Sequence, residues 1–172
     1  GYPWIVMTLA YEQAAGRLNI LKLREDHIVA CLGENLTPDA RRAIRRSFDC
    51  PLINLYESAE CCTIAKSCEI SRGMHVNSDL AILEVVDKDD DPVEIGAVGH
   101  KVYLTNLVNY VQPFIRYEIT DVVTWGEGQC KCGGTLPLID DVSGRTADII
   151  YIERPEGGYQ IVHPYWIMVP LI

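Results

Sequence analysis

Hydrophobic residues follow two different spacings along this 172-residue chain. In the first third, helix-like segments alternate with short apolar runs. Residues 3–16 predict a helix, because Pro3 suits a first helical turn and Gly16 suits the end of a helix. The apolar run 27–32 is flanked by polar residues and predicts a buried strand.

A second helix is predicted to begin after Thr37, whose hydroxyl can cap it, with Pro38 at the first helical position. Ala40, Ile44 and Phe48 recur at helical spacing and give this helix one apolar side. Another strand is predicted at 50–55. This alternation of strand and helix is typical of α/β layers.

From about residue 79 the chain becomes rich in β-branched and aromatic residues, which indicates strands. These stretches are 80–86, 98–104 and 115–125, followed by a last strand at 148–152. We therefore predict an α/β fold, with a strand–helix alternating layer followed by an antiparallel β-rich subdomain. The expected organisation is an α/β segment at 1–66, the β-rich subdomain at 67–142, and a final strand with an apolar tail at 143–172.

Charge and cysteine content restrict the class of protein. The formal net charge of −9 argues against a nucleic-acid partner, because such binding relies on Lys and Arg neutralising phosphates. The arginines of the second predicted helix are interpreted as one solvated helix face; they are Arg41, Arg42, Arg45 and Arg46. No apolar run is long enough to span a membrane. Seven cysteines without an export signal favour a reducing cytoplasm.

Four residues could hold one zinc ion: Cys68, His75, Cys130 and Cys132. A set of three thiolates and one imidazole fills the four tetrahedral positions that zinc prefers, so the site would be structural. The alternative interpretation is a group of free thiols with one surface histidine. If Cys68 is not a ligand, the adjacent Cys61 and Cys62 are the substitutes.

Two further segments carry side chains suited to a nucleotide. In the segment 54–60, Tyr56 could stack on a base and Glu60 could hold magnesium on phosphates, although a polar loop with a buried tyrosine would have the same sequence. Asp121 could accept hydrogen bonds from a ribose diol, with Arg145 as a further donor. Here the alternative is a surface salt bridge between Asp121 and an arginine.

In their order, these segments resemble the adenylate-forming superfamily of acyl-CoA synthetases, and most of all its phenylacetate-CoA ligase branch. The motif Asn54-Leu-Tyr56-Glu-Ser-Ala-Glu60 is similar to the family's adenine motif. The resemblance implies that Asn54 and Tyr56 bind the adenine of ATP or AMP and that Glu60 acts through Mg²⁺. It assigns the ribose to Asp121 and further nucleotide contacts to Arg145. The Cys/His segments resemble stretches of this branch, some of whose members bind zinc.

The resemblance also implies the reaction: a small carboxylic acid is activated as an acyl-adenylate and passed to a thiol such as coenzyme A. The sequence departs from the family at Glu57 (usually glycine), Ala59 (usually threonine) and Ala147 (usually acidic). The family's phosphate loop and lysine-bearing C-terminal domain have no counterpart in these 172 residues. We therefore expect a segment of such an enzyme, with little or no activity alone.

Other functions remain open at this point. The departures favour a non-catalytic, zinc-stabilised domain that binds a nucleotide or docks onto a protein. A redox or sensor protein that uses Cys61 and Cys62 ranks behind both. The apolar tail 165–172 indicates burial against a partner surface, either in a homodimer or against further domains of the same chain.

Overall fold

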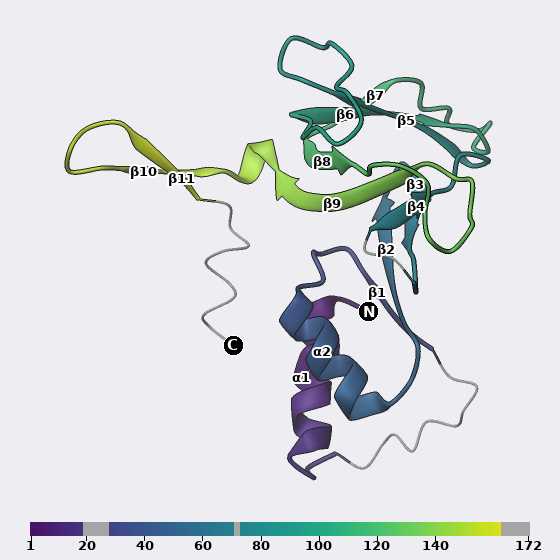
Figure 1. The fold of residues 1–172 in the computed structure, drawn as a ribbon, viewed down its shortest axis with the longest axis vertical. Helices are drawn as coiled ribbons and strands as arrows, with labels where there is room; N and C mark the ends of the chain where they lie inside the picture. Colours follow the sequence, from purple (N-terminus) through teal and green to yellow (C-terminus); the bar gives the residue numbers. More distant parts are fainter. Residues whose placement is uncertain (19–27, 71–72, 163–172) are drawn as a thin grey trace.

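The computed structural model describes residues 1–18, 28–70 and 73–162 (Figure 1). The predicted tail at 165–172 lies outside these residues. Two packed regions form the molecule, with both α-helices gathered at one end and most strands at the other. The α/β class predicted from the sequence is confirmed, as is the antiparallel character of the second region.

The helical region consists of α1 (Pro3–Ala14), β1 (Val29–Leu32), α2 (Pro38–Phe48) and the start of β2 (Leu52–Ser58). Strands β1 and β2 pair in parallel, as expected for strands joined by a helix. The hydroxyl of Thr37 accepts the amide hydrogen of Ala40 and so caps α2. The predicted apolar side of this helix is buried against α1 and β1.

The remaining strands form two layers. A six-stranded sheet has the order β1-β2-β3-β4-β9-β8, and a three-stranded sheet has the order β5-β6-β7. Apolar side chains from both sheets share one buried core. The strand bounds are β3 Cys61–Ser67, β4 Met74–Val76, β5 Ala81–Val86, β6 Lys101–Asn106, β7 Tyr117–Ile119, β8 Asp121–Trp125 and β9 Leu138–Arg145.

Two sequence expectations need adjustment in this region. The stretch 115–125 is two strands, because the chain leaves the three-stranded sheet at Thr120 and enters the six-stranded sheet at Asp121. Ile119 and Val123 still reach the same core from the two sheets. The segment 54–60 belongs mostly to β2, because β3 pairs with it as an antiparallel hairpin.

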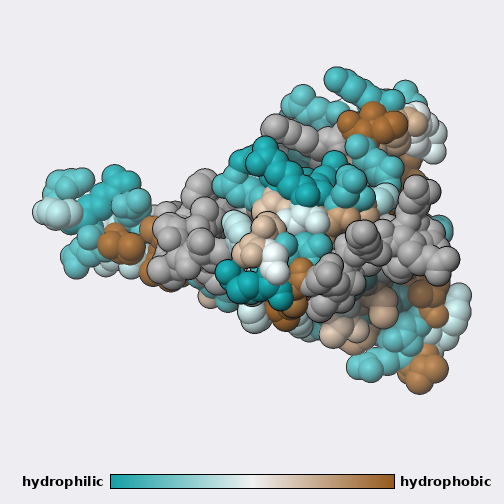
Figure 2. All heavy atoms as spheres, turned by 90° about the horizontal axis from the view of Figure 1, so that it is seen from below, coloured by the Kyte–Doolittle hydropathy of each residue, from teal (hydrophilic) through white to brown (hydrophobic). Residues whose placement is uncertain are grey.

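A two-stranded ribbon projects from the body after a short 3₁₀ turn, η1 (Thr146–Asp148). It consists of β10 (Ile150–Glu153) and β11 (Tyr159–Val162), paired only with each other among the described strands. Figures 1 and 2 show this arm extending away from both packed regions, with hydrophobic atoms on its surface. Among the described helices, neither is long and apolar enough to cross a membrane.

Candidate functional site

The largest cavity has a volume of about 1070 Å³ and lies between the helical region and strands β2, β8 and β9. It adjoins the carboxyl ends of the parallel strands β1 and β2, where ligands usually bind in α/β sheets. Four residues predicted for a nucleotide line this cavity: Asn54, Tyr56, Asp121 and Arg145. Segments that lie far apart in the sequence therefore converge as expected.

Asp121 is the centre of this group. Its side chain is almost fully buried, and each carboxylate oxygen accepts one hydrogen bond. The hydroxyl of Tyr56 donates to Oδ2 over 2.7 Å, and Nε of Arg145 donates to Oδ1 over 3.0 Å. Asp121 and Arg145 are direct cross-strand partners on β8 and β9, so the sheet register brings them together. In the described structure, the expected interaction between Asp121 and an arginine therefore exists and borders the cavity.

The electrostatics of the group favour a protonated tyrosine and a charged arginine. Burial, followed by the negative charge of Asp121, raises the pKa of Tyr56 far above its usual value, so Tyr56 remains a hydrogen-bond donor. The charge of Asp121 also raises the pKa of Arg145. Because Arg145 is mostly exposed, its guanidinium has room to move toward a ligand while Asp121 stays fixed.

Asn54 and Glu57 complete the wall on β2. The backbone amide of Asn54 donates to Oγ of the buried Ser67, but the side-chain Oδ1 of Asn54 is buried without a hydrogen-bond partner. Glu57 follows Tyr56 at a shift in the β2–β3 register and accepts a hydrogen bond from the Thr63 hydroxyl. Such irregularities redirect side chains and are common beside ligand sites.

Glu60 lies elsewhere. It follows the carboxyl end of β2 and lines a second cavity of about 230 Å³, whose walls include Cys61 and Cys62. Its carboxylate raises the pKa of Tyr117 by hydrogen bonding. The structure therefore does not bring Glu60 into the cavity that contains Tyr56, and its predicted magnesium role remains a prediction.

The predicted metal ligands form a second site. The donor atoms of Cys68, His75, Cys130 and Cys132 all lie within 4.8 Å of one another. Sγ of Cys68 lies 3.6 Å from Sγ of Cys130, and Sγ of Cys132 lies 3.3 Å from Nε2 of His75. Tetrahedral zinc with bonds of about 2.0–2.3 Å places its ligand atoms roughly 3.5–3.8 Å apart, so the cluster fits this ion.

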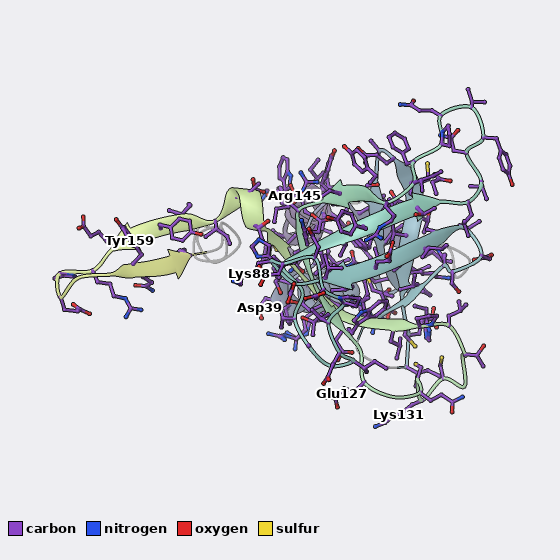
Figure 3. All side chains as sticks on the ribbon, turned by 90° about the horizontal axis from the view of Figure 1, so that it is seen from above. Asp39, Lys88, Glu127, Lys131, Arg145 and Tyr159 are labelled. Carbon is purple, nitrogen blue, oxygen red and sulfur yellow. The ribbon has the colours of Figure 1, made fainter. Side chains whose placement is uncertain are left out.

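The backbone around these ligands is shaped for close approach. The amides of Ile70 and Gly134 donate to Sγ of Cys68 and Cys132, respectively. A Cβ atom at Gly134 would lie 3.1 Å from Cε1 of His75 and 3.2 Å from Sγ of Cys132, which leaves little room for any side chain. Figure 3 shows Lys131 on this loop with sulfur atoms beside it.

Without a metal the four groups affect one another's protonation. Burial lowers the pKa of His75, but hydrogen bonding to Cys68 and Cys130 outweighs it and raises that pKa overall. Cys61 is buried in the main core and Cys62 is exposed, and neither belongs to the four-residue cluster. The structure therefore favours Cys68 over its two substitutes.

Sequence reasoning assigned no role to two contacts that shape the main cavity. Nδ2 of Asn35 donates to the backbone carbonyl of Val142 over 3.0 Å, which joins the helical region to β9. Glu57 was noted only as a departure from a family motif, because the register shift that places it at the cavity depends on β3 pairing. Neither contact has a local sequence signal.

Comparisons with known proteins give a consistent result. No protein-family model matches the chain. The phenylacetate-coenzyme A ligase of Thermus thermophilus is 30% identical over 128 residues, which cover 72% of this chain. The matched region covers only 28% of that ligase, so the chain corresponds to less than a third of its relative.

Solved structures share the fold. A 2-hydroxyisobutyryl-CoA ligase, crystallised with 2-HIB-AMP and CoA, gives a TM-score of 0.74 at 24% identity, over 99% of this chain and 37% of that protein. A benzoate CoA ligase from Burkholderia xenovorans LB400 gives 0.61 at 14% identity, over 94% of this chain and 38% of that protein. Sequence and fold together confirm that the chain is related to the adenylate-forming acyl-CoA ligases, with phenylacetate-CoA ligase as its relative in sequence.

Proposed function

We propose that the chain forms the nucleoside-binding part of an ATP-dependent, AMP-forming acid–thiol ligase. In that reaction a carboxylate attacks the α-phosphate of ATP, pyrophosphate leaves, and a thiol such as coenzyme A then displaces AMP from the acyl-adenylate. Catalysis of this kind depends mostly on positioning and on charge neutralisation. The observation that carries the proposal is the Tyr56–Asp121–Arg145 group at the edge of the 1070 Å³ cavity.

Each residue of this group receives one role. Asp121, held by Tyr56 and Arg145, accepts hydrogen bonds from the ribose hydroxyls through its remaining lone pairs. The ring of Tyr56 forms the wall beside the base, and its hydroxyl fixes the carboxylate. Asn54 offers an unpaired amide oxygen, which suits an amino group such as that of adenine. Arg145, which is mostly exposed, contacts the sugar or the phosphates.

The Cys/His cluster serves this site indirectly. A structural zinc ion would join the loop after β3, strand β4 and the loop between β8 and β9. Strand β9 continues from that loop to Arg145, and β8 begins at Asp121. We therefore assign zinc the task of holding the strands that carry the nucleotide group, with no part in the reaction itself.

Nucleotide titration tests the proposal against the non-catalytic docking alternative. The wild-type chain should bind AMP in isothermal titration calorimetry, and Tyr56→Leu should weaken binding about tenfold or more, because it removes both the wall and the donor to Asp121. Tyr151→Leu, on the exposed ribbon, is the matched control and should bind like the wild type. A docking domain would show no tyrosine-dependent AMP binding, which would refute the proposal.

A further inference from the structure

The four arginines of α2 do not share one environment. Arg42, Arg45 and Arg46 are exposed, whereas Arg41 is partly buried. Arg41 also lines the main cavity, which Arg45 does not. The predicted solvated face therefore holds for three of the four residues, and Arg41 is a separate case.

Arg41 differs from its neighbours in its charge partners as well. Arg42 pairs with Asp39 on the same helix, and Arg145 pairs with Asp121 across the cavity wall. Within the described parts of the chain, no carboxylate forms an ion pair with Arg41. This is notable in a protein with 24 acidic residues and only 15 Lys and Arg residues.

The surroundings of this guanidinium are unfavourable for a cation. Burial, followed by the positive charge of Arg45, lowers the pKa of Arg41. Arg41 also lies in the first turns of α2, where its amide donates to the carbonyl of Thr37, and the N-terminal end of a helix carries partial positive charge. A partly buried cation in such a place gains most from a negatively charged ligand.

The strand register relates Arg41 to the nucleotide wall. The thiol of Cys31 is close enough to interact electrostatically with Arg41, and Cys31 is the β1 residue paired with Asn54 of β2. Asn54 and Tyr56 are two positions apart on β2 and both line the cavity. Arg41 therefore borders the same wall as the groups assigned to the nucleoside.

We propose that Arg41 is an anion-binding residue of the main cavity and takes a phosphate group of the bound ligand. This deepens the proposed function, because phosphates are present both in ATP and in coenzyme A. A guanidinium presents planar, paired donors that match phosphate oxygens. The binding anion supplies the negative charge that the described residues around Arg41 lack.

Pyrophosphate is a suitable first probe, since it needs no nucleoside site. Thermal unfolding is measured for the wild type, Arg41→Met and Arg45→Met, with and without sodium pyrophosphate at constant ionic strength. Methionine keeps an apolar stem and removes the charge. We expect pyrophosphate to stabilise the wild type and Arg45→Met, and its affinity for Arg41→Met to fall about tenfold or more.

The unliganded proteins provide the second readout. Without anion, Arg41→Met should unfold at the same temperature as the wild type or above it, because the variant lacks an unpaired, partly buried cation. A variant that is destabilised equally with and without pyrophosphate would mean that Arg41 only packs, and would overturn the proposal. So would a wild type that pyrophosphate does not stabilise.

Four ligands then separate the source of the phosphate from the nucleoside site. Adenosine binding should be the same in wild type and Arg41→Met, because it involves no phosphate; a failure of the wild type to bind adenosine would count against the nucleoside site alone. A loss confined to AMP and ATP assigns Arg41 to the nucleotide, and a loss confined to coenzyme A assigns it to the coenzyme. Unchanged affinity for AMP, ATP and coenzyme A would contradict the proposal.

Discussion

Removing zinc from the Cys/His cluster should destabilise the chain by a predictable amount. The cluster joins Cys68 to Cys130, which are 62 positions apart. Treated as a cross-link, closure of a loop of that length lowers the entropy of the unfolded chain and contributes about 4 kcal/mol to the free energy of unfolding. For a chain of this size, such a change corresponds to a fall in melting temperature of roughly 8–16 °C.

The perturbation is applied in two ways. A chelator removes the metal from the wild type, and Cys130→Ser removes a buried ligand. Cys62→Ser is the matched control, because Cys62 is an exposed thiol outside the cluster. Melting is followed by circular dichroism, and metal content by elemental analysis, which should give about one zinc ion per chain.

The expected pattern is specific. The chelator should lower the melting temperature of the wild type and of Cys62→Ser, and should have little further effect on Cys130→Ser. Protein that contains no zinc after purification in zinc-containing medium would refute the reasoning. An unchanged melting temperature in the chelator would do so as well.

Three further predictions concern the two sites. The Gly134 amide lowers the pKa of the Cys132 thiol, but Cys130 and burial outweigh it and raise that pKa. Since zinc must displace these protons, its affinity should fall about tenfold per pH unit for each proton displaced as the pH falls from 8 to 6, which competition with a zinc indicator measures. Gly134→Ala should lower zinc affinity about tenfold, because its Cβ would crowd His75 and Cys132; unchanged affinity would show that the loop gives way. For magnesium, Glu57→Gln should reduce the Mg²⁺ dependence of ATP affinity more than Glu60→Gln, because only Glu57 lines the nucleotide cavity; calorimetry with and without Mg²⁺ decides, and the reverse order would restore the role predicted for Glu60.

Local sequence signals accounted for much of the fold. The cap at Thr37, the proline at the start of each helix and the apolar side of α2 all lie where residue type and spacing predict them. These features depend on contacts within one or two helical turns, so a linear pattern contains them. The four zinc ligands were also predictable, because few residue types bind this metal and all four were available.

Features that depend on pairing between distant segments were harder to predict. The split of 115–125 between two sheets follows from how those sheets pack, which no local pattern specifies. The contrast between Glu57 and Glu60 arises at the register shift in the β2–β3 hairpin. The separate environment of Arg41 likewise depends on α2 packing beside β1, so spacing alone assigned it to a solvated face.

The central claim is that Asp121 binds the hydroxyls of a ribose. AMP and 3′-deoxy-AMP are therefore titrated into the wild type and Asp121→Asn, a variant that keeps an acceptor for Tyr56 but loses the charge. The wild type should bind 3′-deoxy-AMP about tenfold more weakly than AMP, and Asp121→Asn should bind the two with nearly equal affinity. Equal discrimination by both proteins would contradict the account, because the hydroxyl would then be recognised by another group.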